Sequence, residues 1–595
     1  MKIIDLEKGI IEGIVNAFDV LYQHKLSKEE VHLQPTKKDF DGEFTFVTFP
    51  YSRISKSNPE ETAKSIGSYL LEHVPAIHDF NVVKGFLNLS IEDKVWIDAL
   101  QKIAGHHDFG IFPDKKETVL VEYSSPNTNK PLHLGHLRNI LLGFSLSKIL
   151  AANGYNVTRV QIINDRGIHI CKSMLAYKKF GQGETPESSG IKGDHLIGKY
   201  YVRFDQEFKK EIAELIQRGV DKKEAEKTAP IILEAQEILK NWEAGDPETV
   251  ELWKRMNSWV YDGFDATYDQ MGVAFDKIYY ESETYLLGKR LVEQGLKEGM
   301  FFQKEDGSAW VDLTDHGLDE KLLLRGDGTS VYITQDMGTA DIRFDDFKFE
   351  KSIYVVGNEQ DYHFDVLFKI LKKLGRTYTE GLYHLSYGMV DLPEGKMKSR
   401  EGTVVDADDL MREMIETARE HTEELGKIEG FSKEEAKVLY EIIGLGALKY
   451  FILKVDPRKR MLFNPKESVD FQGNTGPFIQ YTHARISAIL RRADELGLSR
   501  DGVPDVLHPT EVSLIKLLYD YPSKVALAGE EYSPSVIGQY VYDLAKEYNR
   551  FYAEVSIFNA ENDEIKAFRV LLSSQVARLI KKGMELLGIL VPERM

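Results

Sequence analysis

The sequence contains a single cysteine, Cys171, among 595 residues. One cysteine excludes a disulfide framework and any zinc or iron–sulfur site built from several thiolates. Because Cys171 follows an apolar stretch, we expect its side chain to be a small buried hydrophobe. The sequence also lacks an uncharged apolar run of about 18 residues, the length that a membrane-spanning helix requires. It contains no internal repeat and no low-complexity tract, and its 19 Pro and 46 Gly are ordinary numbers that exclude a fibrous protein.

Positive charge is in the minority. The chain has 76 Lys and Arg against 95 Asp and Glu, which gives a net charge of −19 at pH 7. This balance argues against a protein that coats nucleic acid nonspecifically, although it is compatible with a local basic groove. We therefore predict neither a DNA partner nor a membrane partner. The acidic N-terminal residues do not resemble a secretory signal, and we predict a cytoplasmic protein.

The length suggests about four domains. Strand-like runs at residues 44–49 and 86–89, between helical stretches, predict a small α/β domain over 1–110. A second domain, over 111–430, is expected to carry a charged helical insertion at about 180–330. Residues 431–595 show strong helical periodicity and few β-branched clusters, which predicts a helical domain.

A strand–helix–strand pattern opens the second domain. Residues 118–123 are rich in β-branched residues, 135–152 have helical spacing that ends at Asn153 and Gly154, and 157–163 form the next strand-like run. This order predicts a βαβ unit and hence a parallel sheet. A further strand at 352–356 and a helix at 364–374 continue the alternation. The predicted fold class is therefore α/β.

The loop between the first strand and its helix contains two histidines, His133 and His136, on either side of Gly135. Ligands bind at this edge of a parallel sheet, and the positive end of the helix favours a phosphate there. Gly135 allows a flat ring to approach the backbone. Two imidazoles can donate hydrogen bonds to an α-phosphate as charge develops on it. The alternatives are a zinc pair, which lacks a third ligand nearby, and a pair of helix-capping histidines.

This loop closely resembles the active-site loop of the arginyl-tRNA synthetases, which are class I aminoacyl-tRNA synthetases. The resemblance is carried by Ser125-Pro126-Asn127, Lys130-Pro131 and His133-Leu134-Gly135-His136-Leu137-Arg138. It implies a Rossmann-type catalytic core, an N-terminal α/β domain that contacts the tRNA elbow, and an all-α C-terminal anticodon-binding domain. It also implies that arginine and ATP form arginyl-adenylate and pyrophosphate. Arginine is then transferred to the 2′-hydroxyl of the terminal adenosine of tRNA.

A second loop, residues 395–403, resembles the lysine-containing mobile loop of class I enzymes. The family pattern is Lys-Met-Ser-Lys-Ser, but here the letters are Lys396, Met397, Lys398, Ser399 and Arg400, so the second lysine is missing. The alternative is a solvated charged turn. The resemblance implies that the catalytic residues are His133, His136, Lys130, Lys396 and Lys398. It implies that the ATP ligands are His133, Gly135, His136, Lys396, Met397 and Arg400, with Mg²⁺ on the phosphates and no metal bound by the protein.

The resemblance also implies a pocket for arginine. A guanidinium group is planar and permanently charged, so its receptor needs carboxylates and amide oxygens in one plane. The implied ligands are Glu122, Ser125, Asn127, His136, Tyr332, Asp336 and Gln360. Tyr332 and Asp336 share a face if their segment is helical. The alternative for Glu122 and Asp336 is an internal salt bridge with Arg138 or Arg343.

The implied tRNA contacts are Phe86, Asn88, Tyr548 and Met595. Aromatic rings can stack on unpaired bases, although the same aromatics at helical or strand spacing are often core residues. The family resemblance predicts a monomer. Three other functions stay open: a class I synthetase for another amino acid such as lysine, a small nucleotidyltransferase of the same superfamily, and a non-catalytic tRNA-binding paralogue.

Overall fold

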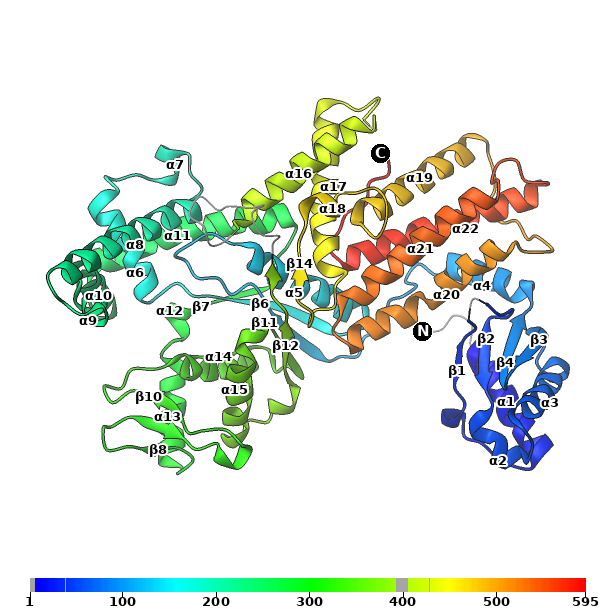
Figure 1. Ribbon diagram of the computed structural model, residues 1–595, viewed down its shortest axis with the longest axis horizontal. Coiled ribbons are helices and arrows are strands. Elements are labelled where there is room, and N and C mark those ends of the chain that lie inside the picture. Colours follow the sequence, from blue (N-terminus) through cyan, green and yellow to red (C-terminus); the bar gives the residue numbers. More distant parts are fainter. Residues whose placement is uncertain (1–5, 38, 392–404, 427) are drawn as a thin grey trace.

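The computed structural model describes residues 6–37, 39–391, 405–426 and 428–595. Four residues predicted from the lysine-containing loop lie outside these ranges: Lys396, Met397, Lys398 and Arg400. Four regions are visible in Figure 1: an N-terminal domain, a central sheet, a helical and stranded insertion, and a C-terminal helical bundle. No helix in the described ranges is long and apolar enough to cross a membrane.

The central sheet has five parallel strands in the order β12-β11-β5-β6-β7. Its strands are β5 (Thr118–Glu122), β6 (Asn156–Ile163), β7 (Lys277–Tyr280), β11 (Lys351–Gly357) and β12 (Leu382–Tyr387). The chain runs from β5 outward to β7, then returns to the other side of β5 as β11. This is the Rossmann order, and its reversal point lies between β5 and β11. The predicted parallel α/β fold is confirmed.

Strand β5 and helix α5 (Leu134–Ala152) form the interior of this core. Val119, Leu120 and Val121 have no exposed surface, as the apolar run predicts. Helix α5 is buried along most of its length because the sheet lies on one side and the C-terminal bundle on the other. Gly154, with φ of +83°, follows the helix, as expected for a left-handed helix end. Cys171 is buried, as predicted.

The N-terminal domain packs helices against an antiparallel sheet of order β1-β2-β4-β3. Its helix α4 contacts the C-terminal helix α20 (Pro509–Glu530), and this contact joins two regions that are distant in sequence (Figure 1). The elements are α1 (Leu6–Tyr22), β1 (Leu33–Pro35), β2 (Phe44–Val47), α2 (Ser52–Ser55), α3 (Pro59–His73), β3 (Ile77–Val83), β4 (Phe86–Ile91) and α4 (Asp93–Gly105).

The insertion differs from the sequence prediction in two ways. Strand β7, inside the range predicted as insertion, belongs to the central sheet. A three-stranded antiparallel sheet, β10-β9-β8, follows the helices, so the segment is not wholly helical. Short strands such as these carry too few residues for a clear alternating pattern. The elements are α6 (Ile168–Phe180), α7 (Pro186–Ser189), α8 (Gly193–Gln217), α9 (Lys222–Thr228), α10 (Pro230–Glu243), α11 (Pro247–Met271), α12 (Glu281–Thr284), α13 (Leu287–Lys297), β8 (Phe302–Gln303), β9 (Ala309–Val311) and β10 (Lys321–Leu324).

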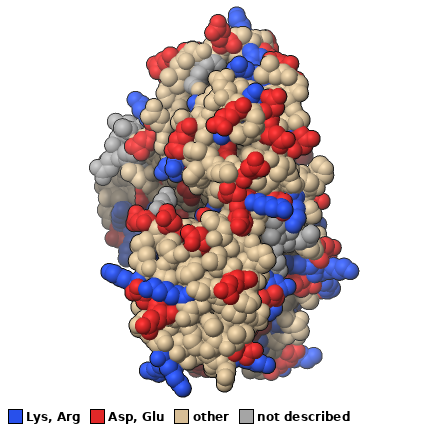
Figure 2. Space-filling view, turned by 90° about the vertical axis from the view of Figure 1, so that its right-hand side faces the viewer, with Lys and Arg blue, Asp and Glu red and all other residues tan. Residues whose placement is uncertain are grey.

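The C-terminal region is helical, as predicted. Helix α5 contacts several of its helices, so the hydrophobic core of the bundle is continuous with the core around the central sheet. Figure 2 shows the face of the molecule that lies on the right in Figure 1. Acidic and basic side chains are interspersed on this face. The remaining elements are α14 (Tyr332–Phe347), α15 (Asp361–Lys373), β13 (Val390–Asp391), α16 (Ala407–Glu424), α17 (Lys433–Leu453), β14 (Met461–Leu462), α18 (Pro465–Ser468), α19 (Gly476–Glu495), α20 (Pro509–Glu530), α21 (Pro534–Glu554) and α22 (Asp563–Leu586).

Candidate active site

The two histidines lie at the N-terminus of α5, beside the point where the strand order reverses. His133 is the N-cap residue, and its Nδ1 accepts a hydrogen bond from the backbone N–H of Gly135 at 3.1 Å. Nδ1 of His136 accepts from the backbone N–H of His133 at 3.2 Å. The ring centroids are 3.9 Å apart. The capping alternative is therefore correct for both Nδ1 atoms, and it leaves each Nε2 as the proton-bearing nitrogen of a neutral ring.

Burial keeps these imidazoles neutral. It lowers the pKa of His133 to about 4, with a smaller contribution from Lys130, and it lowers the pKa of His136 well below its usual value. Burial also lowers the pKa of the Lys130 ammonium group. At neutral pH the site therefore offers two Nε2–H donors from uncharged rings, beside a lysine and the positive end of α5.

The turn that follows β5 is held by several hydrogen bonds. Ser124 and Ser125 have φ of +76° and +44°, which is uncommon for residues other than glycine. The Ser124 N–H donates to Oδ1 of Asn139 at 2.5 Å, and its hydroxyl lies 2.6 Å from the Tyr268 hydroxyl. Asn164, which directly follows β6, donates its backbone N–H to the Pro126 carbonyl at 2.9 Å. The surrounding structure thus maintains an unfavourable backbone conformation next to the predicted arginine ligands.

Glu122, at the end of β5, is buried and forms an ion pair with the buried guanidinium group of Arg343. Its other oxygen accepts a hydrogen bond from the Ser125 hydroxyl at 3.0 Å. The internal salt bridge with Arg343, one of the two alternatives for Glu122, is therefore present. Direct contact between Glu122 and the guanidinium group of the substrate stays a prediction. It would require the carboxylate to bind the substrate and Arg343 at the same time.

The other predicted arginine ligands lie nearer to solvent. The segment of Tyr332 and Asp336 is helical, as their predicted shared face requires, and Tyr332 is 75% exposed at the start of α14. Asp336 pairs with Nε2 of His363 at 2.6 Å. Gln360 and Asn127 are also exposed. Apart from the His363 pair, these side chains are accessible to a small molecule from outside the sheet.

Sequence reasoning missed Glu281, which directly follows β7. Burial raises the pKa of its carboxyl group to about 7, while Arg166 lowers it and the carboxylates of Asp165 and Asp336 raise it further. The preceding strand, β7, lies within the range predicted as insertion, so the sequence does not predict that its carboxyl end reaches the edge of the central sheet. The sequence does contain a signal for Glu281. It directly follows the run Lys-Ile-Tyr-Tyr, whose β-branched and aromatic residues are typical of a strand.

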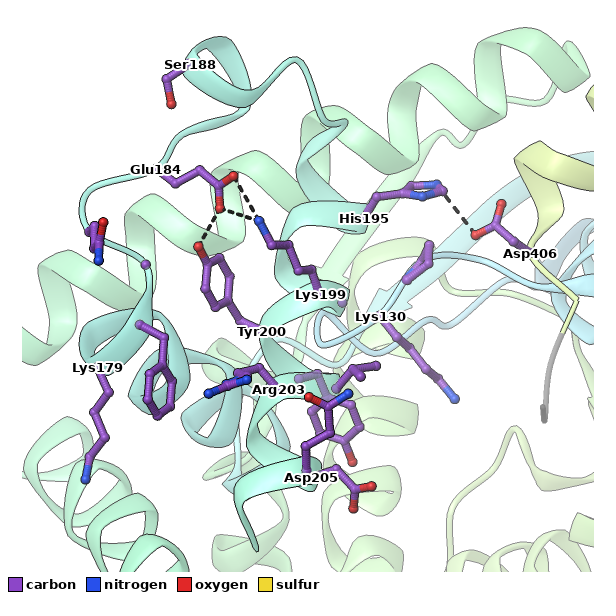
Figure 3. A pocket seen from close by; sticks show the side chains of 18 of the residues that line it. Lys130, Lys179, Glu184, Ser188, His195, Lys199, Tyr200, Arg203, Asp205 and Asp406 are labelled. Atoms are coloured by element: carbon purple, nitrogen blue, oxygen red, sulfur yellow. Dashed lines mark hydrogen bonds and ion pairs between the residues drawn. The ribbon is translucent and has the colours of Figure 1, made fainter. Parts of the chain in front are cut away.

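A groove of about 1580 Å³ extends from the His133 loop along helix α8. Figure 3 shows Lys130 and His195 projecting beside it and Glu184 paired with Lys199 and Tyr200. His195 also lies 3.5 Å from the Asp406 carboxylate. The groove places the catalytic candidates His133 and Lys130 on a solvent-accessible wall.

Two predicted tRNA contacts are buried. Tyr548 has no exposed surface and donates its hydroxyl hydrogen bond to Ser573 at 3.0 Å. Asn88 is 1% exposed and accepts a hydrogen bond from the Thr45 hydroxyl at 2.6 Å. The burial of Tyr548 agrees with the core alternative, and stacking of a base on its ring would require the bundle to open. Tyr552, one helical turn further along α21, is 45% exposed instead.

The other two predicted tRNA contacts are more accessible. Phe86 is half-buried in β4, and its ring packs edge-on against Phe49 at 5.5 Å between centroids. Phe49 is 47% exposed, so it extends the apolar surface around Phe86. Met595 packs partly against the C-terminal core.

Replacing Glu122 with Gln is expected to lower the free energy of unfolding by about 3–5 kcal/mol, because it leaves the Arg343 charge buried without a counter-ion. Adding Arg343→Met should restore most of this loss, since an uncharged pair then replaces the ion pair. Urea denaturation followed by circular dichroism measures both. The matched control is Glu359→Gln, an exposed carboxylate near the same sheet edge. A double variant less stable than the single one would contradict this account of the pair.

Comparison with known proteins agrees with this architecture. The model for the catalytic domain of the class I tRNA synthetases (R) matches residues 100–464, more than half of the chain, and the DALR anticodon binding domain matches 479–595. Arginine–tRNA ligase of Bacteroides thetaiotaomicron is 58% identical, over 99% of this chain and 100% of that one. The corresponding ligase of Amoebophilus asiaticus is 57% identical, over 98% and 99%.

A solved structure supports the same assignment. The arginyl-tRNA synthetase of Thermus thermophilus superposes with a TM-score of 0.78 at 25% identity, over 99% of this chain and 100% of that one. The chain therefore belongs to the arginyl-tRNA synthetase family of class I tRNA synthetases.

Proposed function

We propose that this chain ligates arginine to tRNA at the site around His133. The arginine carboxylate attacks the α-phosphorus of ATP, pyrophosphate leaves, and arginyl-adenylate forms. The 2′-hydroxyl of the terminal adenosine of tRNA then attacks the adenylate carbonyl, and AMP leaves. The observation that carries the proposal is the pair of neutral, helix-capping histidines whose Nε2–H groups remain free of the capping bonds.

The geometry suits charge that develops on a phosphate. His133 and His136 are already oriented by backbone hydrogen bonds, so little reorganisation is needed when the α-phosphate gains charge. The N-terminus of α5 adds a positive dipole, and Lys130 on the groove wall supplies a cation. No side chain forms a covalent bond in this proposal, because positioning and electrostatics supply the catalysis. The proposed roles of the second loop stay predictions, because its residues lie outside the described ranges: Lys396, Met397, Lys398 and Arg400.

Mg²⁺ is proposed to arrive on the ATP phosphates. Within the described ranges, Asp194, His195 and Asp408 are spaced closely enough to suggest a cation site. The Lys192 ammonium group lies 2.5 Å from Asp408, however, so a cation already occupies this position. The donor set therefore fits an ammonium group better than a metal ion, and the metal is assigned to the nucleotide.

Arginine is proposed to bind between the turn after β5 and helix α14. Asp336 offers a carboxylate to the guanidinium group, and Tyr332 offers an exposed ring. Gln360, Ser125 and Asn127 add neutral hydrogen-bonding groups. Glu122 supports this pocket through the Ser125 hydroxyl even while it pairs with Arg343. The monomeric state and the cytoplasmic location stay predictions.

The function is tested by ATP–pyrophosphate exchange, run over all standard amino acids with and without total tRNA. We expect exchange with arginine, since the pocket combines a carboxylate with planar acceptors. Exchange with lysine instead would mean that the pocket assignment is wrong while the class I chemistry holds. No exchange under either condition would contradict the proposed function and favour a non-catalytic tRNA-binding protein.

The histidine role is tested by a matched pair of helix-capping variants. His133→Ala should reduce the exchange rate by about 10²–10³-fold, the usual effect of removing one donor to a developing charge. His508 caps α20 through the same kind of Nδ1 bond, far along the chain from the active-site loop. Both variants should lose about 1 kcal/mol of stability. Equal exchange rates for the two variants would remove His133 from the mechanism.

We propose Tyr552, rather than the buried Tyr548, as an RNA contact in the bundle. The centroid of its ring lies 5.4 Å from the Arg485 guanidinium group. Tyr552→Ala should weaken tRNA binding by about 1–3 kcal/mol, the usual contribution of one stacked base. Tyr548→Phe is the control, because it removes only the buried hydroxyl bonded to Ser573. Fluorescence anisotropy with tRNA at constant salt measures both affinities. An effect of Tyr552→Ala no larger than that of Tyr548→Phe would contradict the proposed contact at Tyr552.

A further inference from the structure

Asp408, in the first turn of α16, is held by side chains from two helices of the insertion. Its Oδ1 accepts a hydrogen bond from the Thr267 hydroxyl of α11 at 2.9 Å. Its Oδ2 accepts from the Lys192 ammonium group at 2.5 Å and lies 2.9 Å from Nε2 of His195. Both carboxylate oxygens are thus engaged, by residues more than 140 positions earlier in the chain.

The charges around Asp408 are complementary. Three carboxylates, those of Asp194, Asp406 and Asp408, face the cationic Lys192 and the titratable His195. Burial would raise the pKa of Asp408, but the hydrogen bonds from His195 and Lys192 lower it below its usual range. Burial would lower the pKa of His195, and the neighbouring carboxylates raise it instead. Relative to the free side chains, the cluster therefore favours the ionised form of Asp408 and the charged form of His195.

The elements that hold Asp408 are themselves closely packed. A Cβ on Gly193, the first residue of α8, would lie 1.9 Å from the Trp259 carbonyl oxygen of α11. A Cβ on Gly263 of α11 would lie 2.5 Å from Oδ1 of Asp194. These two glycines allow α8 and α11 to cross at backbone contact. Thr267 lies one turn beyond Gly263, so the partners of Asp408 belong to one tightly packed unit.

The segment that leads to Asp408 pairs with the loop of His133. The backbone N–H of Leu134 donates to the Val405 carbonyl at 3.0 Å, and that of Ala407 donates to the Leu132 carbonyl at 3.0 Å. His133 lies between these two bonds, opposite Asp406. The backbone on both sides of His133 is therefore hydrogen-bonded to the residues that directly precede Asp408.

We propose that Asp408 is a positioning residue for the activation step, and that its contacts with Thr267, Lys192 and His195 hold the backbone of His133 in its reactive place. The inference rests on the proposed function, since it assigns His133 a role in activation. Asp408 does not touch the substrate in this arrangement. It acts through the 405–407 segment, whose two backbone bonds set where the His133 ring lies.

The test compares Asp408→Asn with Asp409→Asn in the full-length chain. Asp409 is the adjacent carboxylate in the same helical turn, and its side chain pairs with Arg412, three residues further along the same helix, at 2.8 Å. Asp408→Asn should lower kcat for arginine-dependent pyrophosphate exchange by about 10- to 100-fold, because small displacements of a catalytic group are costly. Its KM for arginine should match that of Asp409→Asn, which should exchange at the unaltered rate.

Stability is measured alongside by thermal denaturation, and rates are normalised to folded protein. Thr267→Val removes the hydroxyl that donates to Asp408 and accepts from Lys192, without changing charge. It should lower kcat by roughly fivefold, and it keeps the test decisive if Asp408→Asn does not fold. Equal kcat values for Asp408→Asn, Thr267→Val and Asp409→Asn would overturn the inference. So would a loss confined to the KM for arginine or to stability. If the unaltered chain shows no arginine-dependent exchange, the proposed function fails, and this role of Asp408 fails with it.

Discussion

The reversal of strand order between β5 and β11 is the constraint on which the rest of the site depends. Because all five strands are parallel, their carboxyl ends share one edge, and the reversal separates the connections on either side of β5. The N-terminus of α5 therefore opens at that edge beside the ends of β6 and β11. Glu122 and the histidine loop occupy this position because they directly follow β5. The strand order therefore determines where the site lies, and the individual side chains determine what it can bind.

Helix α11 connects the insertion to this edge. Tyr268 contacts the turn after β5 through the Ser124 hydroxyl, and Tyr261 donates to Asp165 at the end of β6 at 3.0 Å. Thr267 contacts Asp408 at the start of α16. One helix thus bonds to three segments that meet around the site. The surface of the insertion is charged, but the buried side of α11 forms hydrogen bonds to the loops around the candidate site.

Several residues combine a structural role with a proposed chemical role. For these residues, the structural and the functional interpretation are compatible. The histidines cap α5 through Nδ1, and the same bonds leave Nε2–H available for a phosphate. Glu122 pairs with Arg343 and still accepts a hydrogen bond from Ser125. Tyr548 is different, because its ring is enclosed by the bundle and its neighbour Tyr552 carries the exposed aromatic surface. Helical spacing indicates which residues share a face, but it does not indicate which face is buried.

The sequence by itself determined the βαβ unit, the histidine loop at the start of α5, the helical character of the C-terminal region and the family resemblance. These features depend on local periodicity, capping and turn residues, which neighbouring residues encode. Only the tertiary structure decided that β7 joins the central sheet, that Glu122 meets Arg343 across 221 residues, and that Tyr548 is enclosed. Such contacts join distant segments through the strand order and helix packing, so no local pattern specifies them.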